Sequence, residues 1–479
     1  MSRRGSYSDA ARTFMVREAV PIASALLVAM LLAGCAVRAP YTAPATAPAA
    51  LESTDAEFFR TDSYDPRWWR QFEDPVLEQL EGIALESNYN VKIAVARLQQ
   101  ARAIFRDVEL DRFPTAGVGV SVDERERTIP GFTDKPIRTT TYQAGFDAFW
   151  EVDLFGGVRS AVRAAAAQAQ AFEATLDDVR VTVAAEVARQ YFELRGLQQQ
   201  LAVAQRSIDN QGQTLRLTRV RSTEGFGEEL DVASASARVS AIESTVPPLQ
   251  AAILQHTHRL AVLTGSRPGE LAVDLSPRAY APLAKALAVG DPSLLLRRRP
   301  DVRAAERRLA AATGREGVAA ADLLPRISIS GFLGFLAGRG NVFGTADSRA
   351  WAVTPALSWV GLDLGSARAR LRGARAATQE AAAQYEQTVL EALEETENAL
   401  IGYREQQRRL IALADQARES TRAASIARVR YREGVSDFLD LLDAERTQLQ
   451  AEDSVAQAES GVFTSVVAVY KALGGISVQ

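Results

Sequence analysis

The stretch Arg430-Tyr431-Arg432-Glu433-Gly434-Val435-Ser436-Asp437-Phe438-Leu439-Asp440 is the only break in about a hundred residues of helical pattern. Gly434 can end one helix in a left-handed cap, and Ser436 or Asp437 can cap the start of the next. The residues of a coiled-coil seam recur every three or four positions before the break, at Tyr385, Val389, Leu393, Thr396, Leu400 and Tyr403. We expect the chain to return through Leu439, Leu442, Arg446 and Leu449. The pattern predicts a long coiled-coil hairpin with its tip near residue 434.

The same arrangement occurs earlier in the chain. Residues 224–235 align without gaps on residues 433–444, at an offset of 209, and share Glu, Gly, Leu, Asp and Ala at matching positions. Pro247-Pro248 should break the returning helix of this earlier hairpin into two pieces. The chain therefore looks like one hairpin unit used twice, with tips near residues 225 and 434.

Composition excludes several classes of protein. With 479 residues and 47% hydrophobic content the chain can fold, and a net charge of −4 gives no reason to expect nucleic acid. One Cys excludes a disulfide framework, and His256 and His258 would not face one metal from the same helix. His256 has the spacing of a packed residue on the hairpin seam. No nucleophile–base pair or phosphate loop stands out, so we expect neither an enzyme nor a metal or cofactor site.

The N-terminus carries an export signal. The apolar run Pro21–Gly34 follows Arg17 and is too short to span a bilayer, which predicts a signal peptide over residues 1–34, starting at Met1 or Met15. Leu32-Ala33-Gly34-Cys35 resembles the bacterial lipobox, which implies that Cys35 is diacylated and becomes the new N-terminus. The neighbouring Ala36, in place of the Asp that retains lipoproteins at the inner membrane, implies the outer membrane. Residues 36–52, within an N-terminal segment 35–75, have the composition of a flexible tether.

In two regions the spacing of the apolar residues changes from every three or four positions, typical of a helix, to every second position, typical of a strand. After a helix expected over 76–111, a strand at 115–122, an exposed loop at 123–140 and a strand at 142–150 predict a β-hairpin over 115–150. Strands at 327–335 and 351–359 predict a second β-hairpin over 326–359. We therefore divide the chain into a first repeat at 76–275 and a second at 276–479.

The lengths of these elements favour a membrane duct. Strands of about nine residues with aromatic ends match a membrane β-barrel, although each strand taken singly also fits a soluble, half-buried sheet. Four strands cannot close a barrel, and the open edge of a sheet cannot lie in lipid. We therefore expect several chains to contribute their strands to one barrel. A continuous helix from Ser160 to Ser222 would be about 95 Å long. This combination predicts a duct across a membrane and most of an adjoining compartment.

Five features together resemble the TolC-type outer-membrane factors, nearest to the lipoprotein branch that serves tripartite RND-type efflux pumps. They are the lipobox, the two β-hairpins, Phe155-Gly156, the tract Leu295-Leu296-Arg297-Arg298-Arg299-Pro300-Asp301-Val302-Arg303-Ala304-Ala305-Glu306, and Asp440–Arg446. The resemblance implies a mainly helical homotrimer, with a twelve-stranded β-barrel of four strands per chain in the outer membrane. A helical coiled-coil barrel would continue it through the periplasm.

The resemblance also implies partners and function. The partners would be a periplasmic adaptor (membrane fusion protein), an inner-membrane RND-type pump and outer-membrane lipid, with the covalent lipid on Cys35 as the only bound group. The function would be a passive exit duct for drugs, toxic compounds or metal ions.

A gate and a docking site are expected at the hairpin tips. Asp440 and Asp443 share a helix face, and three copies would put six carboxylates around an axis, where they would attract cations. In related ducts the positions matching Leu439, Asp440 and Asp443 narrow the periplasmic mouth, so the resemblance assigns the gate to these three. Asp437 is better placed to cap its helix. Gly225 and Gly434, at the tips, are the candidates for adaptor docking.

Two alternatives stay open at this point. A duct for type I protein secretion would use the same architecture, and only the neighbouring pump would distinguish it. A lipid-anchored structural coiled coil would explain Cys35 and the helices but leaves the four alternating strands unexplained.

Overall fold

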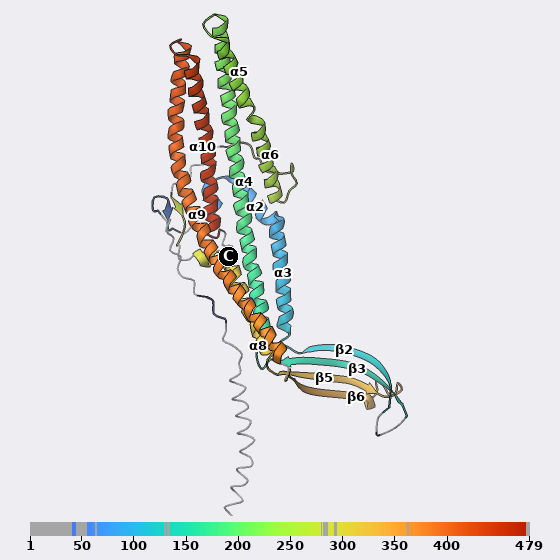
Figure 1. The fold of residues 1–479 in the computed structure, drawn as a ribbon. Coiled ribbons are helices and arrows are strands. Elements are labelled where there is room, and N and C mark those ends of the chain that lie inside the picture. The colour runs from blue at the N-terminus through green and yellow to red at the C-terminus, as the bar shows by residue number, and fades with distance from the viewer. Residues whose placement is uncertain are drawn as a thin grey trace, which may run out of the picture. The chain divides into compact units, whose positions relative to one another are not determined.

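The computed structural model describes residues 41–44, 55–62, 65–128, 131, 135–278, 280, 286–291, 295–361 and 364–475. The predicted signal peptide and Cys35 lie outside the described residues. The fold is mainly helical with a small sheet part (Figure 1). The chain divides into two compact units: unit 1 takes residues 1–44, 100–170 and 306–383, and unit 2 takes residues 45–99, 171–305 and 384–479. Among the described residues, we find no helix with the length and apolar content that a bilayer crossing requires.

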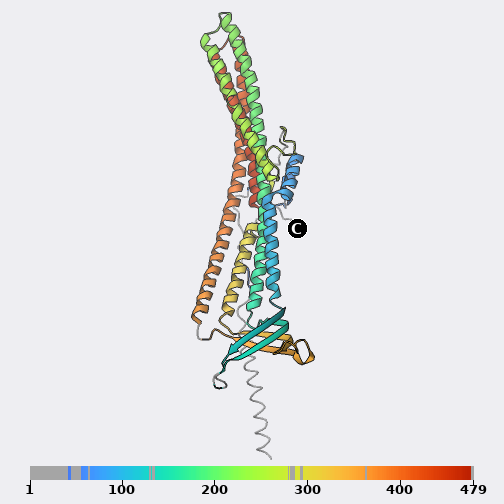
Figure 2. The ribbon, with the colours of Figure 1, turned by 90° about the vertical axis from the view of Figure 1, so that its right-hand side faces the viewer.

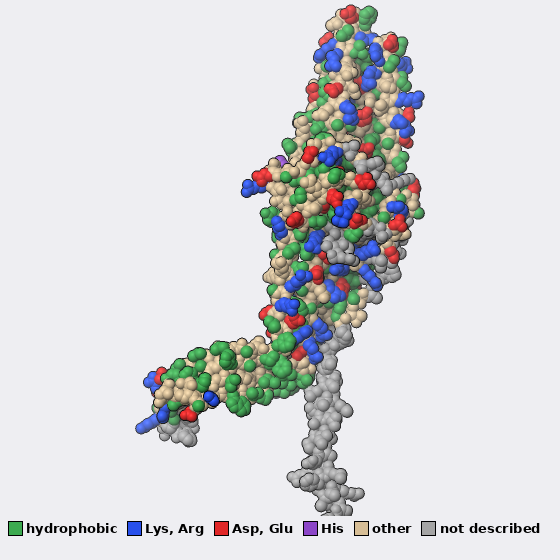
Figure 3. All heavy atoms as spheres, turned by 180° about the vertical axis from the view of Figure 1, so that it is seen from behind, with side chains coloured by type: hydrophobic (Ala, Val, Ile, Leu, Met, Phe, Trp, Pro, Cys, Tyr) green, Lys and Arg blue, Asp and Glu red, His purple; other side chains and the backbone are tan. Residues whose placement is uncertain are grey.

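Unit 1 contains a four-stranded antiparallel sheet in the order β2-β3-β5-β6. Its strands are β2 (Thr115–Arg127), β3 (Ile137–Val152), β5 (Arg326–Ala337) and β6 (Arg349–Ser358). All four predicted strands are confirmed. Val118, Phe146, Leu333 and Trp351 lie opposite one another across the four strands and are all well exposed. Figure 3 shows hydrophobic side chains gathered over this sheet.

The prediction of an exposed loop over 123–140 is wrong at both ends. The strands continue through charged residues, because β2 reaches Arg127 and β3 already begins at Ile137. Opposite charges compensate one another there: Arg138 pairs with Glu124 across the two strands at 2.5 Å. A charged sequence is therefore compatible with a ladder whose side chains face solvent.

The pairing of β3 with β5 joins the two predicted β-hairpins into one sheet. Gly145 lies opposite Gly334 in this ladder. A Cβ atom on Gly145 would approach the carbonyl oxygen of Leu333 to 2.6 Å, so this position has no room for a side chain. The pair of glycines thus allows a close approach of the two backbones.

Unit 2 contains both helical hairpin tips, which lie side by side in Figures 1 and 2. The first hairpin is formed by α4 (Gly157–Thr223), α5 (Glu229–Glu243) and α6 (Val246–Leu263), and the second by α9 (Leu364–Arg432) and α10 (Phe438–Ala472). The helices α4 and α9 begin in unit 1 and continue into unit 2. The predicted break before Pro247-Pro248 is confirmed, since α5 ends at Glu243 and α6 begins at Val246.

The single helix expected over 76–111 is instead two helices, α2 (Pro75–Ser87) and α3 (Tyr89–Leu110). Asn88 separates them in an extended conformation. Its side-chain amide donates to the carbonyl oxygen of Leu263 at 2.8 Å, and its side-chain oxygen accepts from the amide of Asn90. Asn88 thus caps the second helix and ties it to the end of α6.

The hydrophobic core of unit 2 is built on aromatic residues. The short helix η1 (Trp68–Phe72) places Trp68 in a stack on Tyr470, and Phe72 lies edge-on to Phe192. Tyr280 stacks on Phe463 with 4.3 Å between ring centroids. The remaining elements are β1 (Phe59–Arg60), which pairs in parallel with β4 (Leu287–Ala288), then α7 (Leu295–Arg298), α8 (Pro300–Ala321) and η3 (Ala346–Ser348).

Candidate functional site at the hairpin tips

The two hairpin tips have the same backbone geometry. Gly225 and Gly434 adopt φ values of 80° and 75°, in the left-handed region that favours glycine. At each tip the residue after the glycine donates to a carbonyl five residues back: Phe226 to Arg221 at 2.8 Å, and Val435 to Arg430 at 2.9 Å. This is the cap that the sequence predicted for both helices. The proposed roles of Gly225 and Gly434 in docking stay predictions.

The three predicted gate residues lie at the start of α10 and face outward. Leu439 is 67% exposed, and Asp440 and Asp443 are exposed as well. Asp437 accepts a hydrogen bond from the amide of Asp440, which confirms Asp437 as the helix cap. Asp443 forms an ion pair with Arg446 at 2.6 Å, one turn further along. The gate assignment stays a prediction. It assumed a ring of negative charge, and the positive charge of Arg446 offsets part of that charge at Asp443.

The seam predicted for α10 is wrong by one residue. Phe438, Leu441 and Glu445 are buried, whereas Leu439 and Arg446 are exposed. Both sets have helical spacing, and the contacts made by the neighbouring helices decide which one faces inward. This shift leaves Leu439 free of the hairpin core.

Sequence reasoning missed a buried polar cluster around Glu445. The side chain of Glu445 is 2% exposed and pairs with Arg428 of α9 at 2.9 Å. It also accepts hydrogen bonds from Gln211 and Thr214 of α4. Arg238 of α5 lies near it: burial lowers the pKa of Arg238, Arg446 lowers it further, and the charge of Glu445 opposes this shift. A Glu at a seam position was the available signal, but its partners lie far away in sequence.

Arg221 of α4 joins the first hairpin to the second. Its guanidinium donates to the carbonyl oxygen of Tyr431 at 2.6 Å and lies 4.7 Å from the centroid of the Tyr431 ring. The hydroxyl of Tyr431 in turn lies 3.4 Å from that of Thr218. The two tips are therefore linked directly by polar contacts within one chain.

The Arg-rich tract supplies a second polar centre in unit 2. Arg299 is buried and pairs with Asp301 at 2.7 Å and with Glu395 at 2.6 Å. It also donates to the carbonyl oxygen of Ala472, at the end of α10. Burial lowers the pKa of Arg299, but Asp301 and Glu395 outweigh this effect and raise it. The motif thus fastens the end of the second hairpin.

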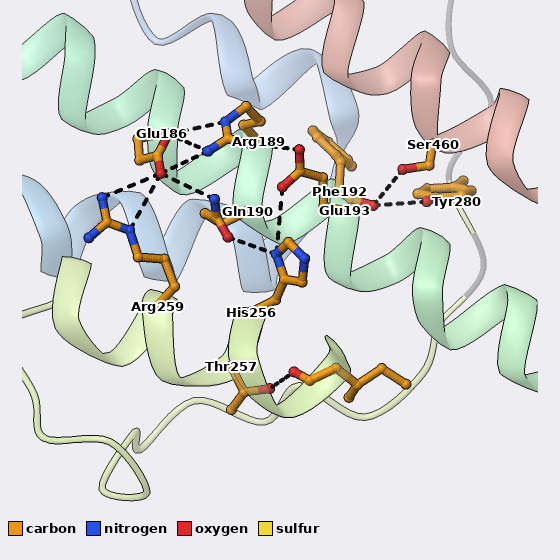
Figure 4. Close-up of polar contacts among 11 residues, drawn as sticks. Glu186, Arg189, Gln190, Phe192, Glu193, His256, Thr257, Arg259, Tyr280 and Ser460 are labelled. Atoms are coloured by element: carbon orange, nitrogen blue, oxygen red, sulfur yellow. Dashed lines mark hydrogen bonds and ion pairs between the residues drawn. The ribbon is translucent and has the colours of Figure 1, made fainter. Parts of the chain in front are cut away.

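His256 belongs to a polar network between α6 and α4, shown in Figure 4. Its Nδ1 lies 2.7 Å from the side-chain oxygen of Gln190 and 3.5 Å from Glu193. Arg189 of α4 pairs with both Glu186 and Glu193. The predicted packing role of His256 is confirmed in part, because the residue is half-buried and hydrogen-bonded. Throughout the described part of the chain, no group of three or more His, Cys, Asp or Glu side chains could hold a metal ion.

Glu81 of α2 is a second buried acid that the sequence pattern did not single out. Its side chain is inaccessible to solvent, and neither carboxylate oxygen has a hydrogen-bond partner. Burial raises the pKa of Glu81 well above its ordinary value. The unfolded chain ionises Glu81 at a lower pH than the folded chain does. The free energy of unfolding should therefore fall as the pH rises above the pKa that Glu81 has in the unfolded chain.

Comparison with known proteins gives consistent matches along most of the chain. The family described as outer membrane efflux protein matches residues 80–266 and 292–475. The pyoverdine export outer membrane protein OpmQ of Pseudomonas putida is 31% identical over 419 residues, covering 86% of this chain and 88% of the relative. The outer membrane protein OprJ of Pseudomonas aeruginosa is 30% identical over 457 residues, covering 94% and 95%.

Solved structures agree with these sequence matches. The outer-membrane channel OprN superposes with a TM-score of 0.90 at 47% identity, covering 92% of this chain and 99% of that one. VceC of Vibrio cholerae superposes with a TM-score of 0.80 at 26% identity, covering 86% and 99%. The fold and these matches define an outer-membrane channel rather than an enzyme. The chain belongs to the outer membrane efflux protein family.

Proposed function

We propose that three copies of this chain form the exit duct of a tripartite efflux system. The observation that carries the proposal is the open sheet of unit 1: within the described residues, β2 and β6 each pair on one side only. The exposed apolar row Val118, Phe146, Leu333 and Trp351 suits lipid, but the free backbone groups of the two edge strands do not. Three such sheets joined edge to edge would close a barrel of twelve strands, four from each chain.

The relatives support small toxic molecules as the cargo. The solvent efflux pump protein SrpC and the antibiotic efflux pump protein ArpC, both of Pseudomonas putida, are each 30% identical to this chain. We propose that this protein likewise conducts drugs or toxic compounds from an inner-membrane RND-type pump and a periplasmic adaptor. Its helical barrel would project into the periplasm, with the tips at Gly225 and Gly434 meeting the adaptor. Diacylation of Cys35 would add a lipid anchor.

The assembly is tested on protein purified from outer-membrane fractions. We expect a trimer that migrates as a monomer only after heating, and discrete conductance steps in planar bilayers. A stable, water-soluble monomer without pore activity would contradict the proposal.

The gate is tested in the same bilayers. We propose that Leu439, Asp440 and Asp443 narrow the periplasmic mouth, so that Asp443→Ala raises single-channel conductance and weakens cation preference. Arg446→Ala should strengthen cation preference, because it leaves Asp443 without its ion-pair partner. Asp415→Ala, on an exposed part of α9, is the matched control. Unchanged conductance and selectivity in both Asp443→Ala and Arg446→Ala would remove the gate assignment.

A further inference from the structure

The apolar face of the sheet in unit 1 carries a hollow around Ala144. Its volume is about 550 Å³, within the range of about 300–1,000 Å³ that small-molecule sites occupy. Ala144 lies between Val120 on β2 and Phe335 on β5, so a single methyl group separates two larger side chains. Leu333 and Trp351 border the hollow on the next two strands and are 65% and 76% exposed. We call this depression the Ala144 hollow.

A charged side chain lies at the edge of the Ala144 hollow. Arg349, the first residue of β6, is opposite Phe335 in the ladder and lines the hollow. Residues directly opposite one another in a ladder share a face, so Arg349 belongs to the same face as Ala144. It is exposed, and within the described residues its guanidinium has no hydrogen-bond or ion-pair partner. The hollow therefore combines an apolar floor with one unpaired positive charge.

Arg349 is the only charged residue of this apolar face. The face consists of alternate residues in 116–122 of β2, 142–152 of β3, 327–337 of β5 and 349–357 of β6. All the other residues in this set are uncharged. Glu124, an acid on the same face of β2 just beyond Val122, already pairs with Arg138 at 2.5 Å. A partner for Arg349 must therefore come from outside the strands of its own chain.

The position of Arg349 along the sheet indicates which leaflet it would meet. The helices α3, α4, α8 and α9 join the strands at one end of the sheet, and the connections β2–β3 and β5–β6 join them at the other. Arg349 lies at the end with the connections, and Tyr142 lies at the same end, one position beyond Ala144 on this face of β3. In the proposed duct the helices extend into the periplasm, so this end lies in the outer leaflet. An arginine there can extend its guanidinium to the level of the headgroups.

We propose that the Ala144 hollow binds one lipid of the outer leaflet, with an acyl chain over Ala144 and an anionic phosphate headgroup on Arg349. The inference rests on the proposed duct, because only a sheet in the outer membrane meets such a lipid. A guanidinium can donate two parallel hydrogen bonds to a phosphate. A free phosphate ion would gain nothing from the apolar hollow, so the lipid is the ligand that uses both parts of the site.

Native mass spectrometry of the purified protein in detergent tests the site. Dioleoylphosphatidylglycerol and dioleoylphosphatidylcholine are added separately, because they have the same acyl chains but only the first has a net negative headgroup. We expect one phosphatidylglycerol per chain, bound about tenfold more tightly than phosphatidylcholine. This ratio corresponds to one hydrogen bond to a charged group, at the lower end of its usual range. Inorganic phosphate should displace neither lipid.

Substitutions separate the two parts of the site. Arg349→Gln should remove the preference, so that both lipids bind equally. Arg349→Lys keeps the charge but cannot form the paired hydrogen bonds, and it should keep only part of the preference. Ala144→Leu fills the hollow and should weaken both lipids without changing their ratio. Arg339→Gln is the matched control, because Arg339 is an exposed arginine just after β5 at the same end of the sheet, and it should keep the full preference.

The mass of each complex and the bilayer conductance of the same preparation keep the outcomes separate. A conducting trimer that binds both lipids equally would overturn the lipid site and leave the duct in place. An unchanged preference in Arg349→Gln would also overturn the site, as would displacement of phosphatidylglycerol by inorganic phosphate. If Arg349→Gln lost the trimer but kept the preference, Arg349 would instead pair with a neighbouring chain. A non-conducting monomer that prefers phosphatidylglycerol would support the site and refute the duct.

Discussion

The two hairpin tips share one backbone turn but differ in their side-chain contacts. Gly225 and Gly434 have the same left-handed conformation and the same pattern of capping hydrogen bonds. The contacts around them do not correspond: Arg221 reaches across to the second hairpin, whereas its counterpart Arg430 is exposed. Glu445 forms the buried polar cluster, and its counterpart in the first hairpin is Ser236. The two copies of the repeated sequence therefore keep the same backbone turn, although the side chains beside the turn make different contacts.

Removal of Glu445 should cause the largest loss of stability among the substitutions that compare the two hairpins. Glu445→Ala leaves Arg428, Gln211 and Thr214 without their shared partner. Loss of one member of a buried ion pair costs about 3–5 kcal/mol, and we expect about 2–4 kcal/mol here because Arg428 is partly exposed. Unfolding by denaturant in detergent micelles measures the change. Ser236→Ala should change stability by less than about 0.5 kcal/mol. Equal effects at the two positions would show that the hairpins are equivalent after all.

Arg221 and Arg430 form the second pair. Arg221→Ala removes a charged hydrogen bond to the carbonyl oxygen of Tyr431 and a cation–π contact, so we expect a loss of about 1.5–3 kcal/mol. Arg430→Ala should be nearly neutral, because its side chain lies in solvent. The same denaturation measurement applies. A large effect at Arg430 would point to a contact made only in the proposed trimer.

Replacement of either tip glycine by alanine should reduce the stability of the protein by the same amount. Gly225→Ala and Gly434→Ala each force a Cβ atom into the left-handed region, at a cost of about 1–2 kcal/mol. Gly402, within α9 and free of nearby atoms, is the control: Gly402→Ala should stabilise by about 0.5–1 kcal/mol. Thermal unfolding followed by circular dichroism reports all three. Unequal losses at the two tips would mean that the shared turn is under different strain in each hairpin.

The helix caps give the smallest expected difference. Asp437→Ala removes a side-chain cap at the start of α10 and should cost about 1 kcal/mol. Its counterpart Glu228 makes no side-chain cap bond, so Glu228→Ala should have almost no effect. Hydrogen exchange at the first amides of α10 and α5 measures each effect locally. Faster exchange in both variants would contradict the difference between the two caps.

Periodic patterns were sufficient to predict the hairpins and the strands. The caps at Gly225 and Gly434 and the break before Val246 follow from local chemistry, so the sequence alone revealed them. The break at Asn88 was missed because it depends on the carbonyl of Leu263, which is distant in sequence. The inward face of α10 was misassigned because residues 438 and 439 both fit a helical seam.

The candidate site was less predictable than the fold. Positions 439, 440 and 443 could be chosen by resemblance, but the ion pair of Asp443 with Arg446 depends on rotamers. The cluster at Glu445 requires the alignment of α4, α9 and α10, which no local pattern specifies. The hydrogen bond from the hydroxyl of Tyr41 to the carboxylate of Glu306 joins residues that lie 265 positions apart. Local sequence rules therefore predict the helices and strands, whereas the polar contacts between these elements are found only in the tertiary structure.

The ladder between β3 and β5 limits how the two halves of the chain can diverge during evolution. Each half contributes one strand to it, and the side chains of a strand alternate between two faces. A single-residue insertion in either strand would move the apolar side chains of that strand to the opposite face. Changes in length are expected to survive only beyond the ladder, in the connections that follow Arg127 and Ala337. Apart from the Gly145–Gly334 pair, which has no room for a side chain, the two strands can change their side chains, but their lengths within the ladder must stay matched.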